Sequence, residues 1–180
     1  YGKIIPREIF EMPAYGTLNI HPSLLPRWRG TSPIQYAILN GDAETGVTFI
    51  KLNEMMDHGD IVAISKIKDQ RAKITYPELH DELAKTGAEL LIHTLPRWIA
   101  RKITPEPQDE SKATWSHKIA KGDGRIHWQK PAEEIERMAR AFTPWPGAWT
   151  MWHNGDVPKR IRIDDAEVID KEPALGAPGF

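Results

Sequence analysis

A chain of 180 residues has room for one complete domain and part of a second. Hydrophobic residues make up 40% of it and charged residues 27%, as in ordinary globular proteins, and no apolar run approaches the ~20 residues that a membrane-spanning helix needs. The 24 basic and 25 acidic residues nearly cancel, so contact with nucleic acid would have to come from a local patch, and the lack of cysteine excludes disulfides, thiolate nucleophiles and cysteine-based zinc sites.

Both ends of the sequence resemble cuts. Tyr1 stands where a Met would be expected, Ile4 and Ile5 follow as if a strand were already under way, and the last residues are a turn signal followed by Phe180. We expect a fragment truncated at both ends, with a processed natural terminus as the alternative. No secretory leader is visible, which together with the lack of cysteine favours a cytoplasmic location.

The first hundred residues show the periodicity of strands alternating with helices. The expected elements are a strand at 17–22, a loop at 23–30, a helix at 33–40, strands at 47–52 and 61–67 around a polar loop at 53–60, and a helix from 76 toward 98. Pro33 suits the first position of its helix, with Thr31 or Ser32 as the cap, and residues 75–78 form a capping-box pattern. This order predicts that residues 1–100 are the end of an α/β domain.

The pattern changes after residue 100. Residues 101–119 are polar, contain prolines and lack periodicity, which indicates an interdomain linker. A short strand at 125–128, a helix from Pro131, and strands at 147–152 and 160–169 then predict the start of a small β-barrel in residues 120–180. We expect the Trp-rich segment 145–149 to belong to the core of this barrel, with a base-stacking platform as the alternative.

Three polar residues of the front half have the chemistry for acyl transfer. Asn19 and His21 are two apart on a predicted strand, so their side chains leave the same face, and Asp57 lies in a later loop before Gly59. An amide can donate to a developing oxyanion, an imidazole can donate or move a proton, and a carboxylate can orient the imidazole. Taken alone, a lone histidine on a strand is more often a structural residue.

The residues around this trio resemble the folate-dependent formyltransferases. Residues 19–30 read Asn-Ile-His-Pro-Ser-Leu-Leu-Pro-Arg-Trp-Arg-Gly, and residues 32–35, 41–48 and 56–61 follow in the order and spacing of that family. Residues 125–128 and 140–149 look like the C-terminal domain of the methionyl-tRNA formyltransferases. The resemblance implies the C-terminal part of a Rossmann-like formyltransferase domain followed by a small OB-like β-barrel domain. It also implies that about 60–100 residues of strand–helix units are missing upstream, so the chain alone is expected to be inactive.

The family resemblance implies a reaction and a set of site residues. A formyl group would pass from 10-formyltetrahydrofolate to the α-amine of methionyl-initiator tRNA, with Asn19 and His21 stabilising the oxyanion and Asp57 holding His21 and assisting proton removal. The residues implied in folate binding are Ser23, Leu24, Leu25, Pro26, Glu54, Met55 and Met56. Many relatives read Gly-Leu-Asp-Thr where this chain has Met55-Met56-Asp57-His58, which leaves the conformation of the loop open.

Four basic residues are candidates for tRNA contact. They are Arg27 and Arg29 beside the site, and Lys118 and Lys121 in a basic strip on the rear half. For the arginines the alternative is pairing with carboxylates, and for the lysines it is a solvated charged face. The histidines do not have metal-site spacing, so we expect no metal. We also expect a monomer without a membrane partner. A sugar-nucleotide N-formyltransferase and a non-catalytic RNA-binding relative are the competing functions.

Overall fold

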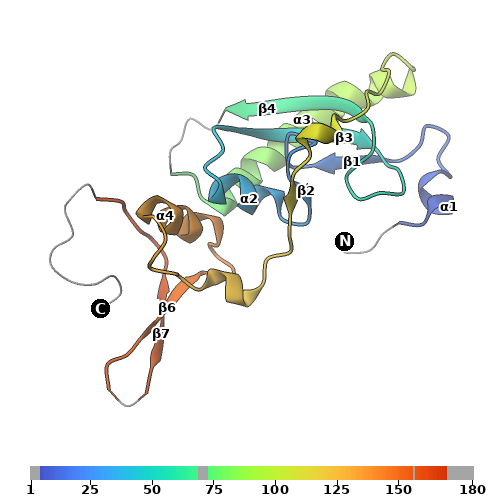
Figure 1. Ribbon diagram of the computed structural model, residues 1–180. Helices are drawn as coiled ribbons and strands as arrows, with labels where there is room; N and C mark the ends of the chain where they lie inside the picture. The colour runs from blue at the N-terminus through green and yellow to red at the C-terminus, as the bar shows by residue number, and fades with distance from the viewer. Residues whose placement is uncertain (1–4, 69–72, 156, 170–180) are drawn as a thin grey trace.

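The computed structural model describes residues 5–68, 73–155 and 157–169 (Figure 1). Its elements run in chain order as α1 (Arg7–Phe10), β1 (Leu18–His21), β2 (Arg29–Gly30), α2 (Pro33–Leu39), β3 (Glu44–Lys51), β4 (Ile61–Lys68), α3 (Tyr76–Ile99), η1 (Glu110–Lys112), β5 (Trp115–Ser116), η2 (Lys121–Gly124), α4 (Ala132–Ala141), β6 (Ala148–Trp152) and β7 (Lys159–Ile163). We call residues 5–100 the front unit and residues 118–169 the rear unit. None of the helices in the described ranges is long and apolar enough to cross a membrane.

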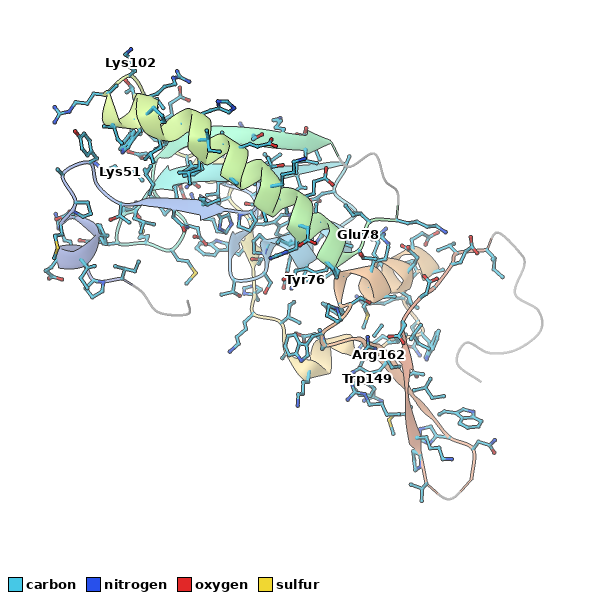
Figure 2. All side chains as sticks on the ribbon, turned by 180° about the vertical axis from the view of Figure 1, so that it is seen from behind. Lys51, Tyr76, Glu78, Lys102, Trp149 and Arg162 are labelled. Carbon is cyan, nitrogen blue, oxygen red and sulfur yellow. The ribbon has the colours of Figure 1, made fainter. Side chains whose placement is uncertain are left out.

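The front unit is built on a three-stranded sheet in the order β1-β3-β4, with both pairs antiparallel. The helix α3 crosses one face of this sheet (Figures 1 and 2). It approaches closely at Gly87, where an added Cβ would lie 3.3 Å from Ile20 and 3.6 Å from Val47. Six of the eight residues of the central strand β3 are buried, because α3 covers one face of the strand and the loop at residues 23–26 lies against the other.

The strands predicted at 17–22, 47–52 and 61–67 and the helices predicted from 33 and 76 are confirmed, with one boundary shifted. The strand expected at the start of the chain is not found at Ile5, while Ile4 lies outside the described residues, and the loop predicted at 23–30 ends in β2. β3 begins at Glu44, three residues before the predicted start at Val47, and Glu44 pairs with Lys68 in the register of β3 and β4. Gly46 is required in this early part, because a Cβ there would lie 2.2 Å from the carbonyl oxygen of Ser65. A Glu-Thr-Gly start looks like a loop in sequence, and it becomes a strand only because a neighbouring strand is available to pair with it.

The rear unit contains α4 and the antiparallel hairpin β6-β7. The helix from Pro131 and the strand near 147–152 are confirmed. The strand predicted at 125–128 is wrong, since residue 125 makes only an isolated bridge to Trp149 before the chain turns. The strand predicted at 160–169 ends at Ile163. In the described part of the rear unit, the sheet is a two-stranded hairpin and does not close into a barrel.

The open hairpin leaves its aromatic side chains at the surface. Trp145 is 50% exposed and Trp152 46% exposed, whereas Ala148 between them is 1% exposed. The expectation that the segment 145–149 is core is therefore wrong for Trp145 and holds for Ala148. The half-buried Trp149 carries the guanidinium of Arg160 4.3 Å from its ring centroid, an arrangement typical of a surface cation–π contact.

The two units share one hydrophobic core. Ile34 and Ile38 of α2 and Leu83 of α3 belong to the same buried cluster as Met138 and Phe142 at the end of α4. Arg137 donates to the carbonyl of Leu39 at 2.9 Å, and Arg140 donates to the carbonyl of Ile74 at 2.8 Å, so polar contacts join the units as well. The rear unit is thus packed against the front unit through α2 and α4.

Candidate active site

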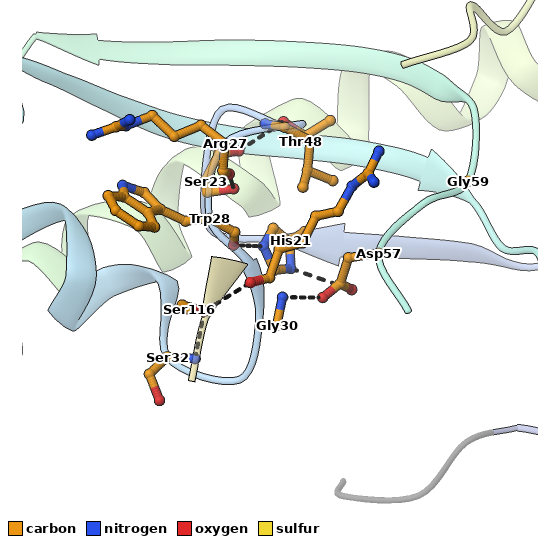
Figure 3. Close-up of polar contacts among 12 residues, drawn as sticks. His21, Ser23, Arg27, Trp28, Gly30, Ser32, Thr48, Asp57, Gly59 and Ser116 are labelled. Carbon is orange, nitrogen blue, oxygen red and sulfur yellow. Dashed lines mark hydrogen bonds and ion pairs between the residues drawn. The ribbon is translucent and has the colours of Figure 1, made fainter. Parts of the chain in front are cut away.

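His21 stands at the end of β1 with its ring buried. The residue is 4% exposed and pairs with Thr48 of β3 in the sheet register. Its Nε2 atom lies 2.9 Å from the carbonyl oxygen of Trp28 (Figure 3). Because a carbonyl can only accept a hydrogen bond, Nε2 carries the proton and donates it. The atom left for chemistry is therefore Nδ1, on the opposite side of the ring.

Asp57 faces this free nitrogen. Its Oδ1 atom lies 3.5 Å from Nδ1 of His21, and its Oδ2 atom accepts a hydrogen bond of 2.8 Å from the backbone N–H of Gly30 (Figure 3). Asp57 has a φ of 53°, a left-handed conformation that Asp tolerates better than most residues. The Asp57 carboxylate is therefore held between the Gly30 N–H and the free ring nitrogen of His21.

The loop that carries Asp57 depends on a glycine two residues later. A Cβ at Gly59 would lie 1.8 Å from the carbonyl oxygen of Lys51, so no other residue fits without moving the backbone. The N–H of Lys51 in turn donates to the carbonyl of Asp60 at 2.9 Å, which closes the base of the loop. These contacts bring the loop back from the end of β3 toward His21.

Asn19 is the third residue of the predicted trio. It lies on β1 two residues before His21, so its side chain leaves the same face of the strand, and it is half-buried. Within the described ranges its amide makes no hydrogen bond, which leaves both N–H donors available to a substrate oxygen. The structure thus brings His21 and Asp57 into contact and places Asn19 beside them on the same strand.

The loop at residues 23–26 forms a rigid wall next to His21. The hydroxyl of Thr48 donates to the carbonyl of Ser23 at 2.7 Å and accepts from the N–H of Leu25 at 3.1 Å. The hydroxyl of Ser23 donates to the carbonyl of Arg27 at 2.6 Å, so it is used inside the loop. Ser23 and Leu25 are buried, whereas Leu24 and Pro26 are half-buried.

The predicted folate residues 54–56 directly precede Asp57 in the same loop and are exposed. Met55 is 56% exposed and Met56 49% exposed. Glu54 forms an ion pair with Arg7 of α1 at 3.1 Å. Glu54 and Met55 also line a hollow of about 670 Å³ between α1 and this loop. The structure therefore provides a concave surface where the sequence predicted a binding loop.

The two arginines beside the site both pair with carboxylates. Arg27 binds Asp42 through two hydrogen bonds of 2.8 and 2.5 Å, and the hydrogen bond to Asp42 raises the pKa of its guanidinium. Arg29 is 2% exposed and binds Glu110 through two hydrogen bonds of 2.9 and 2.6 Å. A buried guanidinium has no surface to offer to RNA, so the expectation of tRNA contact is corrected for Arg29, while Arg27 keeps a side chain that is 44% exposed.

Lys118 and Lys121 are exposed and lie in the rear unit. Lys118 lines a groove of about 590 Å³ between α2 and α4, together with Lys130 and Arg137. Asp123 and Glu134 line the same groove, so its charge is mixed. Across the described residues, no group of three or more His, Cys, Asp or Glu side chains is arranged to hold a metal ion.

Some residues around the site gave no signal in the sequence. The Gly30 N–H binds the Asp57 carboxylate, and the side chain of Gln108 donates a hydrogen bond to the carbonyl of Asp57. Gly30 stands in a recognisable motif, but nothing in the motif says what its N–H binds. Gln108 lies in the aperiodic segment that was predicted to be a linker, so no pattern singles it out.

The front unit is thus an α/β fold in which the imidazole of His21 faces the carboxylate of Asp57, with the amide of Asn19 on the same strand face as His21. Residues 1–95 match the family described as formyl transferase, and residues 118–180 match the formyl transferase C-terminal domain. The chain belongs to the formyl transferase family.

Curated relatives named methionyl-tRNA formyltransferase match nearly the whole chain. The relative from Roseiflexus sp. (strain RS-1) is 45% identical over 179 residues, which cover 99% of this chain and 54% of the relative. The relative from Chloroflexus aurantiacus (strain ATCC 29366 / DSM 635 / J-10-fl) is 48% identical over 172 residues, covering 96% and 54%. The chain thus spans about half the length of these relatives.

Solved structures with the same fold include three that match most of this chain. HypX from Aquifex aeolicus in complex with tetrahydrofolic acid gives a TM-score of 0.70 at 26% identity and is matched over 83% of this chain and 26% of its own. An N-formyltransferase from Helicobacter canadensis, solved with folinic acid and dTDP-3-aminofucose, gives 0.71 at 24% identity, covering 79% and 52%. The methionyl-tRNA formyltransferase from Clostridium thermocellum gives 0.63 at 22% identity, covering 91% and 74%.

Proposed function

We propose that the protein carrying this chain transfers a formyl group from 10-formyltetrahydrofolate to the α-amine of methionyl-initiator tRNA. The observation that carries the proposal is the His21–Asp57 pair, with the free amide of Asn19 on the same strand face. The 43–48% identity to relatives named methionyl-tRNA formyltransferase supports this acceptor over others.

We propose a step for each member of the trio. The amine attacks the formyl carbon, and the resulting oxyanion accepts hydrogen bonds from the Asn19 amide and from Nδ1 of His21, since Nε2 is bound to the Trp28 carbonyl. Asp57 stabilises the charged ring and assists removal of the amine proton through water. The bond to N10 of the folate then breaks, the proton ends on that nitrogen, and tetrahydrofolate leaves.

The folate co-substrate is proposed to bind between two loops. Residues 23–26 supply a wall that Thr48 makes rigid, and residues 54–56 supply an exposed, partly apolar wall beside Asp57. The fold shared with a protein solved in complex with tetrahydrofolic acid supports this class of co-substrate.

The tRNA is proposed to contact the rear unit. Lys118 and Lys121 are exposed there, and Arg27 lies at the edge of the site. The exposed Trp145 and the Arg160–Trp149 pair add surfaces on which bases can stack. We further propose that the hairpin β6-β7 is the beginning of an OB-like barrel, and that residues 101–119 divide the catalytic domain from it.

The acceptor is tested by competition between two substrates. The complete protein that carries this chain is given 10-formyltetrahydrofolate together with either methionyl-initiator tRNA or a nucleotide-linked amino sugar, and the formylated products are quantified. Formylation of the tRNA with little of the sugar is the expected result. Formylation of the sugar alone would assign the protein to the sugar N-formyltransferases.

The trio is tested by changing Asp57 to Asn. We expect kcat to fall by about 10²-fold or more, because an amide at this position cannot accept the proton of the attacking amine, while tRNA binding stays unchanged. Asp60→Asn is the matched control, since Asp60 is exposed in the same loop. Unchanged turnover in Asp57→Asn would refute the catalytic assignment, and tRNA binding by an inactive wild-type protein would indicate a non-catalytic relative.

A further inference from the structure

The segment between the two units passes over the loop that carries Asp57. We call residues 105–116 the strap. Glu106 and Ile61 form an antiparallel bridge with hydrogen bonds of 2.7 and 2.9 Å, and β5 pairs in parallel with β2. The strap is therefore attached at two places near Asp57. One is the start of β4, directly after the loop that carries Asp57, and the other is Gly30, whose N–H binds the Asp57 carboxylate. An added Cβ at Gly30 would lie 2.2 Å from the Ser116 carbonyl, so this pairing is close.

Gln108 of the strap holds the loop directly. Its Nε2 atom donates to the carbonyl of Asp57 and to the carbonyl of Gly59, both at 2.8 Å. A primary amide has two N–H donors, and Gln108 uses both of them on this loop. The side chain is 8% exposed, so water does not compete for these bonds easily. The two carbonyls flank His58 and fix the backbone where Asp57 adopts its left-handed conformation.

Arg29 fixes the orientation of the Gln108 amide. Its Nε and one terminal nitrogen donate to Oε1 of Gln108 at 3.0 and 2.6 Å. A guanidinium only donates and a carbonyl only accepts, so the amide can have only one orientation, with oxygen toward Arg29 and nitrogen toward the loop. Glu110 completes the cluster by pairing with Arg29 and with Nε2 of His58 at 3.2 Å, and Arg29 lowers the pKa of the Glu110 carboxyl.

Burying the guanidinium of Arg29 has a desolvation cost that offsets much of the energy of its ion pair. Stability alone therefore does not explain why a buried arginine stands behind a surface loop. Its geometry, however, imposes one direction on Gln108 and hence one position on Asp57. We propose that Gln108, oriented by Arg29, is a positioning residue for formyl transfer, which holds the Asp57 carboxylate against Nδ1 of His21. This inference rests on the proposed function, since it assigns Gln108 to the same site.

The test uses Gln108→Glu in the complete protein. Glutamate has nearly the same shape and keeps an oxygen for Arg29, but it has no N–H for the two loop carbonyls. We expect kcat to fall about ten-fold or more with both KM values within about two-fold of wild type, because a small displacement of a catalytic group costs rate rather than binding. Glu106→Gln is the matched control, an exposed side chain two residues away on the strap, and it should leave kcat unchanged.

A second readout does not depend on turnover. The Nδ1 resonance of His21 is followed in spectra of ¹⁵N-histidine protein and assigned with His21→Gln. Gln108→Glu should move this resonance in the same direction as Asp57→Asn, because both variants withdraw the carboxylate, and Glu106→Gln should leave it in place. Arg29→Lys, which keeps the charge but cannot contact Gln108 with two nitrogens, should give a smaller change in the same direction.

The outcomes separate this inference from the proposed function. Wild-type protein that formylates neither acceptor would refute the proposed function, and the His21 resonance alone would then decide whether Gln108 places Asp57. An unmoved resonance in Gln108→Glu would overturn the inference whatever the rate. A moved resonance with wild-type kcat in an active enzyme would also overturn it, since Gln108 would then hold the loop without serving the reaction.

Discussion

The hydroxyl of Thr48 links β3 to the loop that forms the wall beside His21. Thr48 is 0% exposed, donates to the carbonyl of Ser23 and accepts from the N–H of Leu25. Neither backbone group has a replacement partner in a buried site, and an unsatisfied buried group costs about 1–3 kcal/mol. One hydroxyl therefore determines both the stability and the shape of the loop at residues 23–26.

Replacing Thr48 with Val removes the hydroxyl and keeps the packing, so it tests what the hydroxyl contributes to stability and to the shape of the loop. Val has the shape of Thr but no hydroxyl, so we expect the free energy of unfolding to fall by about 2 kcal/mol and the KM for the folate co-substrate to rise. Denaturant unfolding and steady-state kinetics measure the two changes. Thr48→Ser keeps the hydroxyl and should retain most of the folate affinity. Equal KM values in the Val and wild-type proteins would argue against a folate wall at residues 23–26.

The residues of the site differ in how far the sequence could predict them. Spacing on a strand predicted that Asn19 and His21 share a face, and the family resemblance singled out Asp57 in an otherwise unremarkable loop. The sequence could not show that Nε2 of His21 is occupied by the Trp28 carbonyl, or that Arg29 points inward. Such facts depend on contacts between residues 7 to 81 positions apart in the chain, which no periodicity or motif encodes.

At the scale of elements, α3 shows the clearest agreement between local sequence and structure. The carboxylate of Glu78 accepts hydrogen bonds from the N–H of Thr75 at 2.9 Å and from its hydroxyl at 2.6 Å. The helix then continues past Gly87, where the missing side chain lets it approach the sheet, to Ile99. The cap therefore determines where the helix that covers the sheet begins.

Changing Thr75 to Ala should lower the free energy of unfolding by about 1 kcal/mol, because the first turn of α3 loses its cap. Thr75→Ser retains a hydroxyl at the same position and should lose only a few tenths of that amount. Thermal or denaturant unfolding monitored by circular dichroism gives both values. An Ala variant as stable as wild type would mean that packing on the sheet, rather than the cap, determines where α3 begins.

The sequence predicted the elements that have local signals, such as caps or alternation. It did not predict the elements that form only by pairing with a neighbouring segment. Proline, capping residues and alternation located α2, α3, α4 and β1. The early start of β3, the bridge at Arg125 and the pairing of β2 with β5 each require a neighbouring segment. Residues 101–119 have the composition of a linker, yet part of this segment pairs with the front unit, because its backbone groups find partners there.

At the scale of the whole molecule, the front and rear units are joined by a shared buried core rather than by a hinge. Phe142, 4% exposed, and Met138, 8% exposed, belong to the cluster that includes α2 and α3. The strap adds backbone pairing to the same junction. Domains that only touch at their surfaces would unfold separately, whereas domains that share a core unfold together.

Phe142→Ala distinguishes these two behaviours. Removing a buried Phe costs about 3–5 kcal/mol. With a shared core, native-state hydrogen exchange should accelerate in β3 of the front unit as much as in β6 of the rear unit, because both are protected by the same global unfolding. Trp152→Ala, at a side chain 46% exposed at the far end of the hairpin, should change neither strand appreciably. Faster exchange in β6 with β3 unchanged would show that the rear unit opens independently, and the buried contact at Phe142 would then be a docking surface between two separately stable domains.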